Sequence, residues 1–212
     1  MTRHPNVRHS AGEDGPLRKS RPPVSSKDTC LFVVPAWNEG GKISTVITEI
    51  IDRGYSVLVV DDGSTDNTYA EAIDSGAKVV RHGLNLGQGA ALQTGFDVAQ
   101  SGDWAALVTF DSDGQHRLED AIAMVEYWQE SQVDVIFGSR FLSSNQGIPR
   151  GRAMVLKLGV IFTRATTRLR VTDAHNGLRL LSRKAFSEIA LRQPRMAHAS
   201  ELVAQVQKLD LA

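Results

Sequence analysis

Residues 104–113 read Trp-Ala-Ala-Leu-Val-Thr-Phe-Asp-Ser-Asp, an apolar run that ends in two acids. Such a run is typical of a strand buried on both faces of a parallel sheet. Asp111 and Asp113 then lie just past its carboxyl end, where ligands collect in open α/β sheets. Carboxylates bind hard cations such as Mg²⁺ or Mn²⁺, but Asp, Ser and Gly are also ordinary turn residues. On this segment alone, a metal site and a polar turn both stay open.

Apolar runs and stretches of helical spacing alternate from residue 29 onward. Helices of 10–15 residues between strands indicate βαβ units. We therefore expect one α/β domain, Rossmann-like, with a mostly parallel central sheet flanked by helices. Pro35 is expected to stop the first strand. The predicted strands are 30–34, 55–60, 77–80, 103–110 and 133–137. The predicted helices are 43–51, 66–75, 88–100 and 118–130, and Thr65 or Asp66 is expected to cap the second of them.

The pattern changes after Gly138. Residues 150–169 form a long amphipathic stretch whose basic residues suit either a lipid surface or a helix packed on the domain with solvated arginines. A strand is predicted at 177–181, followed by helices from 183 and over 199–209. A further strand would be expected beyond Ala212, which suggests a truncated sequence or a short family member.

Composition narrows the class of protein. Residues 1–28 are rich in Pro, Ser, Gly and charge and predict a disordered leader, which leaves residues 29–212 as the domain. The 24 basic residues balance the 24 acidic ones, so charge gives no hint of a nucleic-acid partner. No run approaches the ~20 apolar residues that span a bilayer. The single cysteine, Cys30, excludes an intrachain disulfide and is expected to be buried and inert. We expect a cytoplasmic protein, with peripheral contact to the membrane face as an open alternative.

Polar clusters follow three of the predicted strands, at 35–39, 61–66 and 111–113. The carboxyl ends of parallel strands meet at one edge of a sheet, so these clusters should converge. Acidic clusters in one place repel one another unless a cation or a hydrogen-bonded ligand offsets them. The convergence predicts a site for a nucleotide diphosphate and a metal ion.

Four motifs in order make the pattern specific: residues 34–39, 60–68, 85–92 and 111–116. Together they resemble the family-2 glycosyltransferases of the GT-A fold, and most of all the dolichol- or polyprenyl-phosphate sugar synthases. The resemblance runs from about residue 29 to 208 and implies a single GT-A domain.

The resemblance implies a nucleotide pocket lined by Pro35, Trp37 and Glu39, with Trp37 in place of the family's usual Tyr. It implies that Asp62 accepts hydrogen bonds from the base or ribose, while capping or turn formation is the alternative for that residue. Gly89 opens a predicted helix whose N–H groups could face phosphate.

The resemblance also implies that Asp111, Asp113 and Gln115 surround a Mg²⁺ or Mn²⁺ ion, with Asp113 the surest ligand. Asp111 is expected to contact the nucleotide sugar as well. Asp113 then acts in catalysis, because the ion that it holds neutralises charge on the leaving diphosphate. His116 is expected beside this group or facing solvent, rather than on the metal.

Four further residues are catalytic candidates by the same resemblance. Arg140 is expected near phosphate groups, with a surface salt bridge as its alternative. Asp173 and Arg179 are expected to face the acceptor or the diphosphate. Glu201 is expected beside the acceptor, with a solvated helix carboxylate as the alternative. A hydroxyl acceptor would need Asp173 or Glu201 as its base, whereas a lipid phosphate would need little.

The function implied is inverting, metal-dependent transfer of a sugar from a nucleotide-diphosphate sugar. The acceptor implied is a polyprenyl or dolichyl phosphate, or else a cell-envelope glycan. Two alternatives stay open: a catalytically silent nucleotide-sugar-binding scaffold, and a sugar-phosphate nucleotidyltransferase. Residues 35–40 lack the Gly-rich, basic loop that a nucleotidyltransferase normally carries after its first strand.

Overall fold

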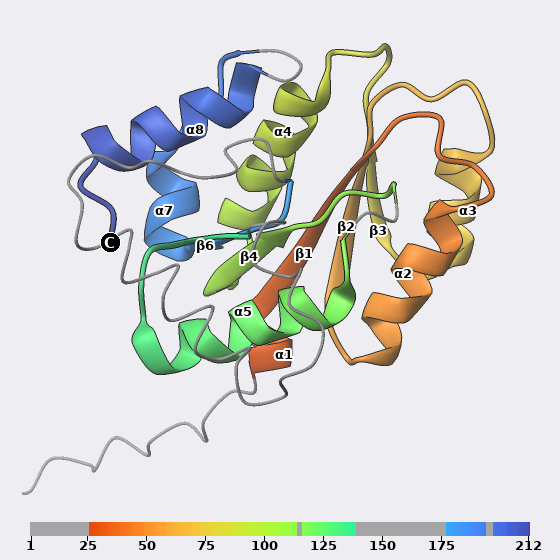
Figure 1. The fold of residues 1–212 in the computed structure, drawn as a ribbon. Coiled ribbons are helices and arrows are strands. Elements are labelled where there is room, and N and C mark those ends of the chain that lie inside the picture. The colour runs from red at the N-terminus through yellow and green to blue at the C-terminus, as the bar shows by residue number, and fades with distance from the viewer. Residues whose placement is uncertain (1–25, 114–115, 139–176, 194–196) are drawn as a thin grey trace, which may run out of the picture.

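The computed structural model describes residues 26–113, 116–138, 177–193 and 197–212. Within them, helices lie on both sides of one central sheet (Figure 1). The strands are β1 (Cys30–Ala36), β2 (Ser56–Asp61), β3 (Lys78–Arg81), β4 (Ala106–Thr109), β5 (Val135–Phe137) and β6 (Arg179–Ser182). The helices are α1 (Ser26–Thr29), α2 (Ile43–Asp52), α3 (Thr68–Asp74), α4 (Gln88–Gln100), α5 (Leu118–Ser131), α7 (Arg183–Glu188) and α8 (Ala197–Lys208).

The described strands form a six-stranded sheet in the order β3-β2-β1-β4-β6-β5. The pairs β3–β2, β2–β1 and β1–β4 are parallel, whereas β6 runs antiparallel to both β4 and β5. The expectation of a mostly parallel sheet flanked by helices is confirmed. Because β6 is reversed, its first residue, Arg179, pairs with Thr109 and Phe137 and so lies at the carboxyl edge of β4 and β5.

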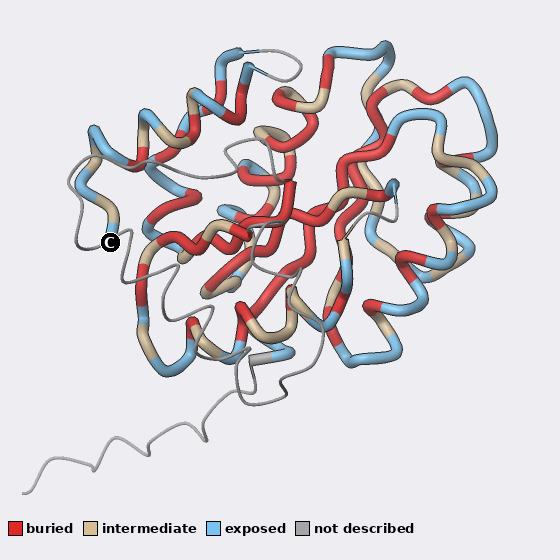
Figure 2. The backbone as a smooth tube through the Cα atoms, viewed as in Figure 1, coloured by how far each residue is buried: buried red, intermediate tan, exposed pale blue. Residues whose placement is uncertain are grey.

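Two apolar layers hold the helices to the sheet, because alternate strand residues point to opposite faces. Phe32, Val34 and their equivalents on other strands pack against α2, α3 and α5. Leu31, Val33 and their equivalents pack against α4, α7 and α8. The central strands are buried throughout, while exposed residues gather on the outer helix faces and the loops (Figure 2).

The expectation that Pro35 ends the first strand is wrong, because β1 continues to Ala36. The Val33 carbonyl accepts from the Phe110 N–H, so the polar groups of residues 33 and 35 face the β4 side. Strand β4 ends at Thr109, and the Pro35 carbonyl there accepts from the Ser112 hydroxyl at 3.3 Å. A backbone N–H at position 35 would therefore find no partner in the sheet. The strand tolerates proline there because no hydrogen bond is lost.

Smaller differences lie at the ends of elements. The helix expected at 66–75 begins at Thr68 and has Asn67 at its N-cap. Helix α1 covers residues 26–28 of the expected leader, while residues 1–25 and the stretch 150–169 lie outside the described residues. Cys30 is buried as expected, and burial raises the pKa of its thiol to about 12. Among the described helices, none has the length and apolar character needed to cross a membrane.

Candidate active site

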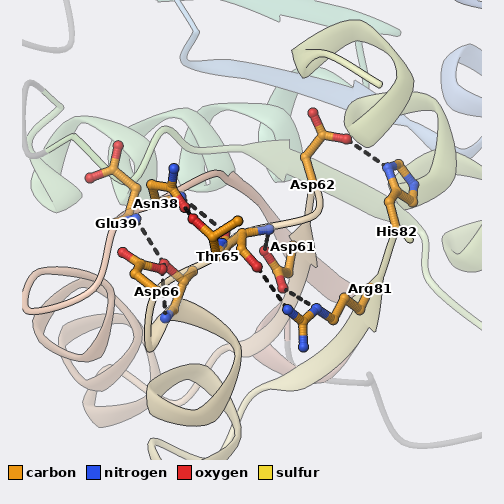
Figure 3. A network of polar contacts seen from close by, with 10 residues as sticks. Asn38, Glu39, Asp61, Asp62, Thr65, Asp66, Arg81 and His82 are labelled. Atoms are coloured by element: carbon orange, nitrogen blue, oxygen red, sulfur yellow. Dashed lines mark hydrogen bonds and ion pairs between the residues drawn. The ribbon is translucent and has the colours of Figure 1, made fainter. Parts of the chain in front are cut away.

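The loops that follow β1 and β2 are joined by hydrogen bonds at the carboxyl edge of the sheet (Figure 3). Asn38 adopts a left-handed conformation, with φ 55°. Its N–H donates to the Ser64 hydroxyl at 2.9 Å, and its side-chain oxygen accepts from the Thr65 N–H at 2.9 Å. The Glu39 N–H donates to the Thr68 hydroxyl at 2.8 Å. The backbone of the first loop is therefore fixed by side chains of the second.

Asp61, the last residue of β2, is fully buried. One of its oxygens accepts from the Ser64 N–H at 3.0 Å, which closes the turn after the strand. The other lies 3.0 Å from Nε of Arg81, which occupies the paired position on β3. The Arg81 N–H is not aligned with that oxygen, so this contact is an ion pair rather than a hydrogen bond. Asp61 thus holds the turn together from inside the fold.

Asp62 is also buried, and both of its oxygens bind groups of this chain. They accept from the N–H groups of Leu86 and Gly87 at 2.9 and 2.7 Å. His82 lies on the other side, with Nδ1 at 2.8 Å from the carboxylate and Nε2 at 2.9 Å from the Thr94 hydroxyl. Asp62 therefore fixes the turn that leads into α4, and its role toward a base or ribose stays a prediction.

Asp111 lies beside the first turn of α4. The Gln88 amide donates to one Asp111 oxygen at 2.9 Å, and Nε2 of His116 lies 3.2 Å from the other. The backbone of Gly177, which precedes β6, presses against the same carboxylate. About one fifth of the Asp111 side chain is still exposed. Because an ionised carboxylate offers about four lone-pair sites, these contacts leave acceptor capacity on Asp111.

Asp113 is exposed, whereas Ser112 between the two acids is buried and bonded to Pro35. The described residues contain no cluster of three or more His, Cys, Asp or Glu side chains that could hold a metal. Mg²⁺, however, is commonly held by one or two carboxylates plus substrate phosphates. The carboxylates of Asp111 and Asp113, both in contact with solvent, fit that requirement. Gln115, the third predicted ligand, lies outside the described residues.

Among the predicted nucleotide residues, Pro35, Trp37 and Glu39 lie in or after β1, whereas Gly89 lies in α4. Pro35 is buried in β1, and Trp37 follows that strand with 54% of its surface exposed. Glu39 is partly exposed, at 3.8 Å from the Lys42 ammonium group. Gly89 is different, because a Cβ there would lie 2.9 Å from Cβ of His198 and closer still to the Gln193 carbonyl. The space at Gly89 is therefore taken by the chain near α8.

Of the four further catalytic candidates, the structure describes Arg179 and Glu201. Arg179 is 1% exposed at the start of β6, level with the end of β4. Glu201 on α8 accepts from the N–H groups of Arg192 and Gln193 at 2.9 and 2.8 Å. Arg140 and Asp173 lie outside the described residues.

Sequence reasoning missed three residues that contact the predicted site: His82, Gln88 and Gly177. For His82 a signal existed, because it follows the third strand as the acids follow the second and fourth. The clusters at 35–39, 61–66 and 111–113 carry the same signal. Gln88 lies within the motif at 85–92 and Gly177 shares a segment with Asp173 and Arg179, but their contacts with Asp111 arise only in the folded chain.

Comparison with known proteins places this geometry in a class. The fold is GT-A: the chain is similar to glucosyl-3-phosphoglycerate synthase from Mycobacterium tuberculosis, solved with Mg²⁺ and UDP, with a TM-score of 0.62 and 22% identity over 85% of this chain and 66% of that one. Residues 31–190 match the family described as Glycosyl transferase family 2. The chain belongs to this family and is a glycosyltransferase.

Two sequence relatives extend the match. An uncharacterised protein of Methanocaldococcus jannaschii is 34% identical over 193 residues, which cover 88% of this chain and 79% of the relative. The UDP-N-acetylglucosamine–dolichyl-phosphate N-acetylglucosaminyltransferase of Methanococcus voltae is 28% identical over 206 residues, covering 85% of this chain and 81% of the relative. The resemblance to sugar synthases that use lipid phosphates is thereby confirmed.

Proposed function

We propose that this glycosyltransferase moves a sugar from a nucleotide-diphosphate sugar to a polyprenyl or dolichyl phosphate. The observation that carries the proposal is the placement of Asp111 and Asp113 after β4, with Asp111 bonded to Gln88 on the first turn of α4. Trp37 follows β1, the neighbouring strand, and its exposed indole offers a face on which a base can stack. Nucleotide and metal ligands would thus meet at one edge of the sheet.

We propose Asp111, Asp113 and Gln115 as the ligands of a Mg²⁺ or Mn²⁺ ion. When bound, such an ion supplies a Lewis acid that neutralises charge on the leaving diphosphate. Exposed Asp113 suits direct contact with the ion and the donor phosphates, while Asp111 is oriented by its bonds within the chain. Arg140 and Arg179 are proposed to add positive charge beside the diphosphate, because guanidinium groups bind phosphate in a bidentate manner.

The proposed reaction inverts the anomeric carbon. An acceptor oxygen attacks the anomeric carbon from one face. On the opposite face the bond between that carbon and the donor diphosphate oxygen breaks, and the nucleoside diphosphate leaves with the electron pair. A phosphate acceptor is already anionic and needs no strong base. The contacts of Glu201 are consistent with such an acceptor. Its carboxylate already accepts from two backbone N–H groups and is therefore not available as a base. Asp173 would be needed as a base only for a hydroxyl acceptor.

A lipid acceptor also suggests where the protein works. We propose that residues 29–212 act as the catalytic domain at the cytoplasmic face of a membrane, with the basic stretch 150–169 contacting the lipid surface. Flotation with anionic liposomes at low salt tests this contact. Protein that stays at the bottom of the gradient would contradict it.

The donor site is tested by calorimetric titration of the purified protein with UDP-, GDP- and dTDP-sugars, with and without Mn²⁺. We expect one donor to bind, and to bind at least tenfold more tightly with Mn²⁺. The next assay adds polyprenyl phosphate and follows labelled sugar into the organic phase. A folded protein that binds no donor, or that transfers sugar equally well in excess chelator, would overturn the proposal.

A further inference from the structure

The carboxylate of Asp111 is enclosed by the chain on three sides. Gln88 contacts one oxygen at 2.9 Å and His116 the other at 3.2 Å. On the third side lies Gly177, where a Cβ would stand 2.5 Å from one Asp111 oxygen and closer still to the other. Because real Cβ contacts are never that short, no side chain fits at position 177 while Asp111 keeps its place.

Hydrogen bonds to two other strand ends anchor the backbone at Gly177 and Leu178. The Gly177 carbonyl accepts from the Thr109 hydroxyl at 2.5 Å, and the next carbonyl, of Leu178, accepts from the Gly138 N–H at 2.9 Å. Thr109 is the last residue of β4 and Gly138 directly follows β5, and these two strands flank β6 on either side. An alanine at position 177 would therefore meet a steric conflict with the Asp111 carboxylate.

We infer that Gly177 and Gln88 are positioning residues for Asp111, and that they set the direction in which its carboxylate presents oxygens to a divalent cation. This inference rests on the proposed function, which makes Asp111 a metal ligand. A methyl group at position 177 would push the carboxylate aside and break its bond to Gln88. Partners that orient a ligand in this way commonly change metal affinity by about 10–100-fold when they are lost.

The test measures Mn²⁺ affinity directly, from the electron paramagnetic resonance signal of free Mn²⁺, alone and with UDP or GDP. We expect Gly177→Ala to weaken Mn²⁺ binding by about 10–100-fold. Gln88→Ala should weaken it by about tenfold, since one of the two side-chain contacts remains. Affinity for the nucleotide without metal should change much less than Mn²⁺ affinity in both variants. Gly83→Ala is the matched control, because a Cβ there meets nothing within 4 Å and its φ is not positive.

The outcomes separate the inference from the function on which it rests. Wild-type protein that binds a nucleotide but no Mn²⁺ would overturn the proposed metal site. Wild-type protein that binds Mn²⁺, with an equally tight and folded Gly177→Ala variant, would overturn the inference alone. If Gly177→Ala fails to fold, Gln88→Ala decides, because truncating a partly exposed side chain on the first turn of α4 spares the core. Wild-type Mn²⁺ affinity in Gln88→Ala would then overturn the inference.

Discussion

Two pairs of acids follow two parallel strands of this sheet, and the structure buries one pair while it leaves the other in contact with solvent. Asp61 and Asp62, at the end of β2, are buried and bound on both oxygens by groups of the chain itself. Asp111 and Asp113, after β4, keep contact with solvent, one partly and the other openly. In sequence, both pairs are acids at a strand end.

The difference lies in what surrounds each pair. The β2 pair meets backbone N–H groups, the Arg81 guanidinium at the end of the adjacent strand and the ring of His82, so its oxygens are engaged within the chain. Charge-assisted hydrogen bonds of this kind stabilise loops. The β4 pair follows a strand that lies between β1 and β6, and Asp111 stays partly exposed and Asp113 exposed. One pair therefore contributes mainly to stability, while the other is suited to a ligand.

The largest expected effect tests the β4 pair. Asp113→Ala should lower turnover by at least about 10³-fold, or roughly 4 kcal/mol, because charge on the leaving diphosphate loses its counter-charge. The free energy of unfolding should change by less than about 0.5 kcal/mol, since Asp113 is exposed. Steady-state kinetics and urea unfolding on the same preparation measure both. A variant with full activity would remove Asp113 from the metal site.

The next effect tests the β2 pair and should have the opposite character. Asp62→Ala removes a buried carboxylate that accepts from two backbone N–H groups and contacts His82. Hydrogen bonds to charged groups contribute about 1.5–3 kcal/mol each, so we expect a loss of about 3 kcal/mol in the free energy of unfolding. Asp62→Asn, which keeps one acceptor oxygen, should lose less. Wild-type stability in Asp62→Ala would show that the comparison between the two pairs is mistaken.

Much of the fold could be predicted because its signals are local. Helix α4 was predicted over residues 88–100 and is observed there, since Gly87 and Gly102 flank a clear helical pattern. Strands β2 and β3 were predicted to within one residue from their apolar runs. The reversal of β6 could not be predicted, because a strand of four residues contains nothing that states its direction.

For the site, the sequence predicts only that polar residues at several strand ends gather at one edge of the sheet. Apolar runs that end in acids indicated where the acids would gather, and the structure places both pairs at the carboxyl edge. Which pair is enclosed depends on contacts across 20 residues or more, such as His82 with Asp62 and Gln88 with Asp111. A single sequence does not contain that information. The role of Trp37 stays a prediction, although its exposure is what base stacking requires.

The smallest effect concerns Asp66, an exposed acid in the same loop as the β2 pair. Its carboxylate accepts from the hydroxyl and the N–H of Thr68 at 2.5 and 3.0 Å, and from the Gly40 N–H at 2.9 Å. The hydrogen bond from the Thr68 side chain is the main reason that its pKa lies below the ordinary 3.8. Folding therefore favours the ionised form, so this contribution to stability is complete above the ordinary value and is lost as the pH falls through the lowered pKa.

The matched variants are Thr68→Ser, which keeps the hydroxyl donor, and Thr68→Val, which removes it. We expect the pKa of Asp66, followed by carboxyl NMR titration, to stay low in Thr68→Ser and to rise toward 3.8 in Thr68→Val. Asp66→Asn should cost stability at pH 7 and progressively less below pH 3.8, as the wild type loses the charge that the variant never had. A constant difference across that range would mean that Asp66 binds the loop without its charge. The loop after β2 would then depend on the buried pair alone for its electrostatic stabilisation.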